Sequence, residues 1–147
     1  MKLVVFCLFA VCCSSLASTT ERPLRKLLEV MSELQAVRKN LKNNDTMLNI
    51  PPQNLTGCCG PSALQCFRAN LNVKFGITER APTKEGKLYR SLKMGLTERS
   101  LNFICDSTNA QLNCPHCDEH PKGNVTQFFD SLESLFQKAI ATRRSME

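Results

Sequence analysis

Apolar residues recur at steps of three and four along two long segments, one near each end of the chain. The first segment runs from Thr20 to about Leu41, and the second runs from Asn124 to about Ile140. Such a stripe lines one face of an α-helix, so we predict two amphipathic helices that pack against a core. The stripes consist of Leu24, Leu27, Leu28, Met31, Leu34, Val37 and Leu41 in the first segment and of Val125, Phe128, Phe129, Leu132, Leu135, Phe136, Ala139 and Ile140 in the second.

Polar residues at the ends and flanks of these segments agree with that prediction. Thr20 can cap the first helix, and Pro23 is tolerated because the amide groups of a first turn have no intrahelical acceptor. Asn124 and Gln127 have the spacing of a capping box at the start of the second helix. The charged residues of the first segment are expected to lie largely outside its stripe, and they are Arg25, Lys26, Glu29, Glu33, Arg38 and Lys39.

Two further helices are predicted in the middle of the chain. One begins at Gly60 and Pro61, ends before Gly76, and has an apolar stripe made of Ala63, Leu64, Phe67, Leu71 and Phe75. The other begins at Thr83 and is weakened by its glycines. Its apolar side consists of Leu88, Tyr89, Leu92 and Leu96, and its basic side consists of Arg80, Lys84, Lys87, Arg90 and Lys93.

Long polar connections separate the predicted helices. Residues 42–56 and 106–123 are rich in Asn, Asp and Pro and are predicted to be surface loops. No alternating apolar and polar run of useful length occurs, which disfavours a sheet. We therefore predict an all-α fold, a four-helix bundle whose long crossover loops permit the up-up-down-down topology of helical cytokines.

The N-terminus has the pattern of a secretory signal peptide. A short basic start is followed by the apolar run Leu3–Val11 and then by small residues, and Ser15 and Ala17 place the expected cleavage after Ala17. The apolar run is shorter than the roughly 20 residues that span a bilayer. We predict a signal peptide over 1–17 and one secreted, extracellular domain over 18–147.

The cysteines and sequons fit the same compartment. An even number of cysteines in an oxidising environment favours disulfides, and those left after cleavage are Cys58, Cys59, Cys66, Cys105, Cys114 and Cys117. N-glycosylation sequons lie at Asn44, Asn54 and Asn124. The adjacent pair Cys58-Cys59 also resembles chemokines, but chemokines carry it near the mature N-terminus and follow it with three strands.

The sharpest candidate for chemistry is the sequence Cys114-Pro115-His116-Cys117 with His120 nearby. A C-x-x-C with a histidine can bind zinc, but the other ligands would have to come from cysteines in an oxidising compartment, so bridges are the favoured interpretation. A redox-active C-x-x-C normally opens a helix in a βαβ pattern, and none is predicted. Both histidines are expected to be solvated. No catalytic motif is recognised, so we expect no enzymatic activity, metal or cofactor.

The net charge of +6 adds one more constraint. Basic residues are concentrated between Arg80 and Arg99. A secreted protein rarely meets nucleic acid, so this excess favours acidic protein surfaces or sulfated polysaccharide, with a solvated helix face as the plain alternative. The rival function is a basic helical host-defence protein that acts on membranes, which would need an exposed apolar face.

The C-terminal third is similar to part of a known cytokine family. Its matching residues are Leu112–Asp118 (Leu-Asn-Cys-Pro-His-Cys-Asp), Pro121-Lys122, Phe128-Phe129 and Ser131–Ile140, which ends in Gln-Lys-Ala-Ile. Upstream, Cys59 and Cys66 followed by Phe67 match a family cysteine pair, and Arg25 to Leu34 looks like its first helix. These residues resemble the interleukin-21 branch of the interleukin-2/15/21 family of short-chain helical cytokines.

The resemblance implies a crossed disulfide pairing and a receptor-binding function. It implies Cys59 with Cys114 and Cys66 with Cys117. Cys58 and Cys105 depart from the family pattern, and we expect them to form a third bridge. The implied protein is a secreted monomer, not inserted in a membrane, that binds an interleukin-21-type private receptor chain and the common gamma chain. Holding both chains together triggers JAK/STAT signalling in lymphocytes.

The resemblance also carries over particular residues. Gln137 and Ile140 align with residues that contact the common gamma chain, although Ile140 also lies on the apolar stripe and core packing is its alternative role. Arg25, Leu28 and Glu29 align with positions that face the private receptor chain. The basic side of the third predicted helix is expected to complement an acidic receptor loop, as a region and not residue by residue.

Overall fold

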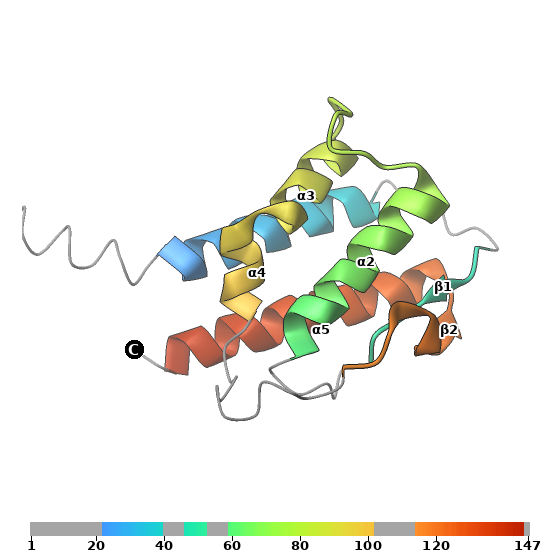
Figure 1. Ribbon diagram of the computed structural model, residues 1–147. Helices are drawn as coiled ribbons and strands as arrows, with labels where there is room; N and C mark the ends of the chain where they lie inside the picture. The colour runs from blue at the N-terminus through green and yellow to red at the C-terminus, as the bar shows by residue number, and fades with distance from the viewer. Residues whose placement is uncertain (1–21, 40–45, 53–58, 102–113, 146–147) are drawn as a thin grey trace, which may run out of the picture.

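The computed structural model describes residues 22–39, 46–52, 59–101 and 114–145, of which 76% are helical. A first helix covers residues 22–39. The other elements are β1 (Leu48–Asn49), α2 (Gly60–Phe75), α3 (Lys84–Lys93), α4 (Gly95–Leu101), a short 3-10 turn (Cys117–Glu119), β2 (Lys122–Gly123) and α5 (Val125–Ser145) (Figure 1). The predicted signal peptide lies outside the described residues. No described helix is long and apolar enough to cross a membrane.

The first helix and α5 lie side by side and run in opposite directions (Figure 1). Arg38 of the first helix forms ion pairs with Asp130 and, at 3.1 Å, with Glu133 of α5. α2 contacts both α3 and α4, and α4 also contacts α5. The helices thus enclose one core.

Phenylalanines fill the centre of that core. Phe67 of α2 and Phe128, Phe129 and Phe136 of α5 are fully buried. The Phe67 and Phe128 rings are 5.2 Å apart at 69°, and the Phe128 and Phe129 rings are 5.4 Å apart at 85°. Edge-to-face contacts of this kind add to the gain from burying the rings. The pairing of α2 with α5 is therefore built on aromatic packing.

The predicted bounds of α2 and the predicted start of α5 are confirmed. α2 begins at Gly60 and ends at Phe75, where Gly76 adopts a left-handed conformation (φ 66°) that suits glycine. At the start of α5, the backbone N–H of Gln127 donates to Asn124 Oδ1 at 2.8 Å, and the backbone N–H of Asn124 donates to Gln127 Oε1 at 3.0 Å. This reciprocal pair is the predicted capping box.

The prediction of one helix from Thr83 onward is wrong, because the segment divides into α3 and α4. Met94 has an extended backbone (ψ 136°) and interrupts the helix. The carbonyl of Ser91 accepts hydrogen bonds from the Met94 N–H at 3.3 Å and from Thr97 Oγ1 at 2.7 Å, so the break is held from both sides. Within the described residues there are thus five helices where the sequence predicted four.

The two predicted surface loops are partly wrong as well. β1 pairs with β2 in antiparallel register, Leu48 opposite Gly123 and Asn49 opposite Lys122. Leu48 is fully buried in the core. Strands of two residues are too short to show an alternating pattern, so they could not be predicted from the sequence. The pairing holds both connections against the bundle.

The first helix buries a broader face than its leucine stripe indicated. Lys26 and Glu33 were expected outside the stripe and are buried, whereas Leu28 was placed in the stripe and is 42% exposed. The cause is α3, which covers this side: Lys26 Nζ donates to Ser91 Oγ at 3.5 Å, and Lys87 Nζ lies 3.9 Å from Glu33 Oε1.

We predict that Phe128→Ala lowers the free energy of unfolding by about 3–5 kcal/mol, because it removes a fully buried ring that contacts two others. Urea unfolding followed by circular dichroism measures this. Val73→Ala is the control, since Val73 is 74% exposed on α2 and should change stability by less than about 0.5 kcal/mol. Equal effects of both substitutions would contradict the described core.

Candidate binding surfaces

The outer face of the first helix carries the residues expected to face a private receptor chain. Arg25, Leu28 and Glu29 are all exposed. Leu28 is one of four large apolar side chains exposed among the described residues, the others being Met47, Val73 and Met94. An exposed leucine flanked by charges has the composition of a small interface centre with a polar rim.

Two sides of the first helix can be told apart by their contacts. Glu29 lies on the α3 side, because its carboxylate is 3.7 Å from Lys26 Nζ and Lys26 contacts Ser91 of α3. Met31 lies on the α5 side, because it is two turns before Arg38, which pairs with α5. The first helix therefore offers one edge beside α3 and another beside α5.

On α5 the structure separates the two residues expected to contact the common gamma chain. Gln137 is exposed. Ile140 is only 8% exposed and belongs to the core, so the alternative role of core packing describes most of its side chain. The ion pair between Arg38 and Asp130 shows that these two residues lie level on neighbouring antiparallel helices. Both helices rise equally per residue, so Met31, seven residues before Arg38, lies level with Gln137, seven residues after Asp130. Gln137 thus borders the α5 edge of the first helix.

The basic side of α3 is less free than its sequence indicates. Arg90 Nη1 donates to the carbonyls of Glu79 at 2.8 Å and Ala81 at 3.0 Å. Lys93 Nζ lies 3.1 Å from Glu79 Oε2, and Lys87 pairs with Glu33. Several of these cations therefore hold the α2–α3 connection and the first helix in place.

Two disulfides fasten the segment before β2 to α2. Cys59 is bonded to Cys114 and Cys66 is bonded to Cys117, with Cα atoms 5.5 Å and 5.0 Å apart. These are the two pairs that the resemblance implies. Because both cysteines of the C-x-x-C are bonded, they supply no thiolates for zinc, and no group suited to a metal lies within the described residues. The proposed bridge Cys58–Cys105 lies outside those residues.

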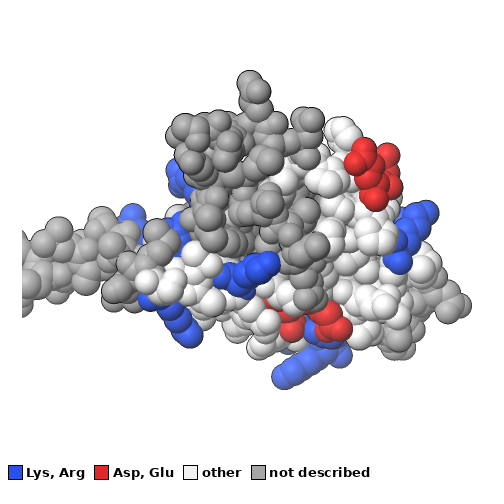
Figure 2. Space-filling model, turned by 90° about the horizontal axis from the view of Figure 1, so that it is seen from below, with Lys and Arg blue, Asp and Glu red and all other residues white. Residues whose placement is uncertain are grey.

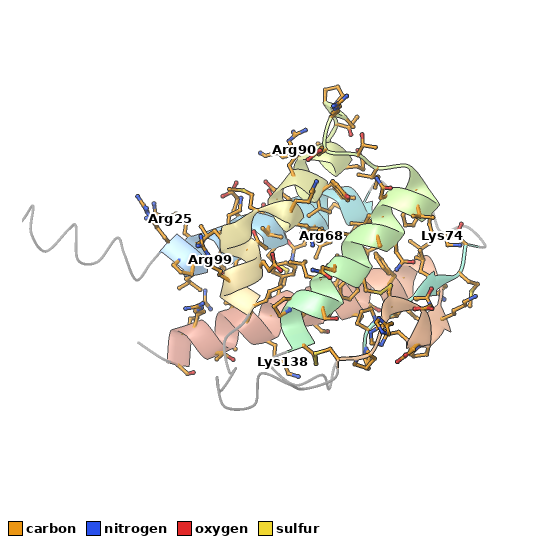
Figure 3. All side chains as sticks on the ribbon, in the orientation of Figure 1. Arg25, Arg68, Lys74, Arg90, Arg99 and Lys138 are labelled. Carbon is orange, nitrogen blue, oxygen red and sulfur yellow. A yellow bond between two sulfur atoms is a disulfide. The ribbon has the colours of Figure 1, made fainter. Side chains whose placement is uncertain are left out.

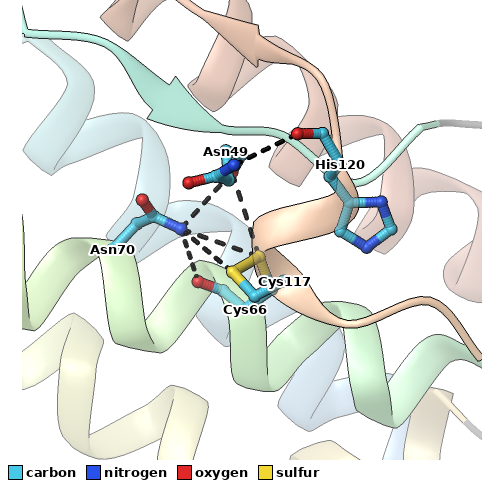
Figure 4. Close-up of a disulfide and its surroundings, with 5 residues drawn as sticks. All are labelled: Asn49, Cys66, Asn70, Cys117 and His120. Carbon is cyan, nitrogen blue, oxygen red and sulfur yellow. Dashed lines mark hydrogen bonds between the residues drawn. A yellow bond between two sulfur atoms is a disulfide. The ribbon is translucent and has the colours of Figure 1, made fainter.

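A cluster of side-chain amides surrounds the Cys66–Cys117 bridge (Figure 4). Asn70 Nδ2 donates to the carbonyls of Cys66 at 2.9 Å and Asn49 at 3.3 Å, and it lies 3.5 Å from Cys117 Sγ. Asn49 Nδ2 in turn donates to the carbonyl of His120 at 3.1 Å. The cluster joins α2, β1 and the turn before β2.

Sequence reasoning did not single out Asn49 or Asn70. A signal for Asn70 was present, because it lies three residues after Phe67, on the apolar stripe of α2, where a polar residue must find buried partners. No comparable signal identifies Asn49.

His120 was expected to be solvated, and this prediction is wrong. Its side chain is 7% exposed, whereas His116 is exposed as expected. Burial lowers the pKa of His120 below its ordinary value, and the negative charge of Glu119 raises it to a smaller extent. The fold therefore favours the neutral imidazole.

Of the three sequons, only Asn124 lies within the described residues. It is exposed, and its Oδ1 caps α5, while a glycan would be attached to Nδ2. Asn44 and Asn54 lie outside the described residues. Glycosylation stays a prediction at all three positions.

No protein-family model matches the chain. The functional interpretation therefore depends on the residue-level resemblance and on the surfaces described above.

We predict that Asn70→Ala lowers the free energy of unfolding by about 1–3 kcal/mol, because it removes the buried amide that donates to the carbonyls of Asn49 and Cys66 and joins α2 to β1. Chemical denaturation of the oxidised protein measures the change. Asn72→Ala, which removes a single hydrogen bond from an exposed asparagine of the same helix, should cost about 1 kcal/mol or less. A loss at Asn72 as large as that at Asn70 would refute a special role for the amide cluster.

We predict that stability falls as the pH drops below the ordinary histidine pKa of about 6.5. His120 has a lowered pKa when folded, so the unfolded chain binds more protons in this range and acid favours unfolding. Thermal midpoints measured from about pH 7.5 to about pH 5 should show a slope that is reduced in His120→Gln and retained in His116→Gln. An unchanged slope in His120→Gln would place the titrating group elsewhere.

Proposed function

We propose that this protein is a secreted cytokine of the interleukin-21 type, which acts by holding two different receptor chains together. The observation that carries the proposal is the pair of edges on the first helix, one beside α3 with Glu29 and one beside α5 at the level of Gln137. Each edge borders residues that the resemblance assigns to a different receptor chain.

We propose the up-up-down-down arrangement as the topology of the bundle. In Figure 1 the first helix and α2 both run toward the right, whereas α3 and α5 run back toward the left, which supports it. α4 follows the break at Met94 and turns away from the direction of α3 (Figure 1).

The private receptor chain is proposed to bind the first helix through Arg25, Leu28 and Glu29. Exposed Leu28 would fill a shallow apolar pocket, and the two charged neighbours would form the rim. The basic side of α3 adjoins the first helix, because Lys87 of α3 pairs with Glu33 of the first helix. The exposed part of that basic side therefore extends the surface proposed for the private receptor chain.

The common gamma chain is proposed to bind α5 through Gln137. An amide can donate and accept hydrogen bonds at an apolar interface without the desolvation cost of a charge. Because Ile140 is almost fully buried, it contributes at most the edge of its side chain. This mechanism requires no chemistry in the ligand, because the kinases are associated with the receptors and phosphorylate STAT proteins inside the cell.

The rival function on membranes receives less support. An amphipathic helix that binds a bilayer must present its apolar stripe to the lipid. Here Leu27, Leu34, Phe128 and Phe136 of the two strongest stripes are fully buried against other helices. If the folded protein caused vesicles to leak, that result would favour the membrane-active function over the cytokine function.

We predict that Gln137→Ala raises the concentration needed for STAT phosphorylation in lymphocytes at least about tenfold, because a central interface residue contributes more than about 1.4 kcal/mol. Binding to the private receptor chain should change less than about twofold. Gln65→Ala is the matched control, since Gln65 is an exposed glutamine on α2. An antibody that blocks the common gamma chain should abolish the response to the unmodified protein.

Two results would overturn this assignment. One is phosphorylation that resists the blocking antibody, and the other is an equal loss of activity in Gln65→Ala and Gln137→Ala. Ile140→Asp is unsuitable for this experiment, because it would place a charge in the core and unfold the bundle.

A further inference from the structure

Arginines from three helices meet at one end of the molecule. Arg25 lies thirteen residues before Arg38 on the first helix, and Arg143 lies thirteen residues after Asp130 on α5. Because Arg38 and Asp130 are paired and the helices are antiparallel, Arg25 and Arg143 lie at the same level. The start of the first helix and the end of α5 lie at the same end in Figure 1. Figure 3 places Arg25 and Arg99 at that end and Lys74 at the opposite one.

The end of α4 joins this group through a direct contact. Arg143 Nη2 of α5 donates to the carbonyl of Arg99 at 3.5 Å. We call this group, which consists of Arg22, Arg25, Arg99, Arg143 and Arg144, the arginine end.

At the arginine end, positive charges from three helices lie together, and most of them are not paired with a described carboxylate. Elsewhere Lys26, Arg38, Lys87 and Lys93 form ion pairs with glutamates or aspartates. Among the described residues, no carboxylate forms an ion pair with the four arginines Arg22, Arg99, Arg143 and Arg144.

The surface view agrees with this separation of charge. In Figure 2 the blue side chains at the left have no red group beside them, and the red groups lie toward the middle and the right of the view. The nearest described acid on α4 is Glu98, which lines a hollow of about 360 Å³ together with Arg99 and Pro61.

The chemistry of this surface fits a flexible chain of sulfate groups. Guanidinium groups bind planar or tetrahedral oxyanions through paired hydrogen bonds and are weakly hydrated. A protein partner would need an apolar centre, and none of the large apolar side chains exposed among the described residues belongs to this group. Leu28, one turn along the first helix from Arg25, is the centre proposed above for the private receptor chain. Anionic lipids are concentrated in cytoplasmic leaflets, which a secreted protein does not meet.

We propose that the arginine end binds a sulfated polysaccharide of the heparan sulfate class, which would retain the protein at cell surfaces and in the extracellular matrix. The proposal rests on the secretion assumed under the proposed function, but on neither receptor assignment. Binding of heparin by the purified protein tests it without any receptor.

The test compares two triple variants that each remove three positive charges. Arg22→Gln, Arg99→Gln and Arg144→Gln change the arginine end, and Lys74→Gln, Arg80→Gln and Lys122→Gln change exposed residues elsewhere. Circular dichroism first confirms that both variants fold. Dissociation constants for heparin are then measured at about 150 mM NaCl, together with binding to fully desulfated heparin and to phosphatidylserine vesicles.

The proposal predicts that the first variant binds heparin at least about tenfold more weakly, whereas the second changes by less than about threefold. Desulfated heparin should not bind. Equal losses in both variants would show that net charge alone is responsible, and this would overturn the proposal. So would the absence of heparin binding at this salt concentration, or an equally tight, arginine-dependent association with the vesicles.

Discussion

The contact between Phe67 of α2 and Phe128 of α5 is the interaction on which the rest of the fold depends. Phe128 also contacts Phe129, so one aromatic group fills the space between the helices. Burying these rings uses the apolar faces of α2 and α5 and leaves their other sides to the solvent. The side of α5 that carries the rings faces the core. Ile140 lies on that side and is buried, whereas Gln137 lies on the other side and is exposed.

The disulfides connect that core to the long connections. Cys66 immediately precedes Phe67, so its bridge to Cys117 fixes the turn before β2 at the centre of α2. Asn70 and Asn49 extend the attachment to β1, and the pairing of β1 with β2 closes it. Two covalent bonds over separations of 55 and 51 residues thereby stabilise a small bundle, mainly by restricting its unfolded chain. The long connections are thereby attached to the helices that present the candidate surfaces.

The sequence predicted the helix ends that depend on a few adjacent residues. Gly76 ends α2 and the Asn124–Gln127 box starts α5, because such ends depend on a few adjacent residues. Periodicity does not show the break at Met94, which is held by hydrogen bonds to the carbonyl of Ser91. Nor does it show the burial of Lys26 and Glu33, which arises from the contact of the first helix with α3. For the candidate surfaces, exposed Arg25, Leu28, Glu29 and Gln137 agree with the residues singled out, whereas the burial of Ile140 and His120 depends on packing between distant segments.

We propose that one small bundle holds two receptor chains, one on the first helix beside α3 and the other on α5 where it borders the first helix. The most direct measurement is the mass, by light scattering after gel filtration, of a mixture with the soluble ectodomains of an interleukin-21-type receptor and the common gamma chain. We expect a complex that contains one copy of each of the three proteins. Complexes with only one receptor chain, or displacement of one chain by the other, would contradict it.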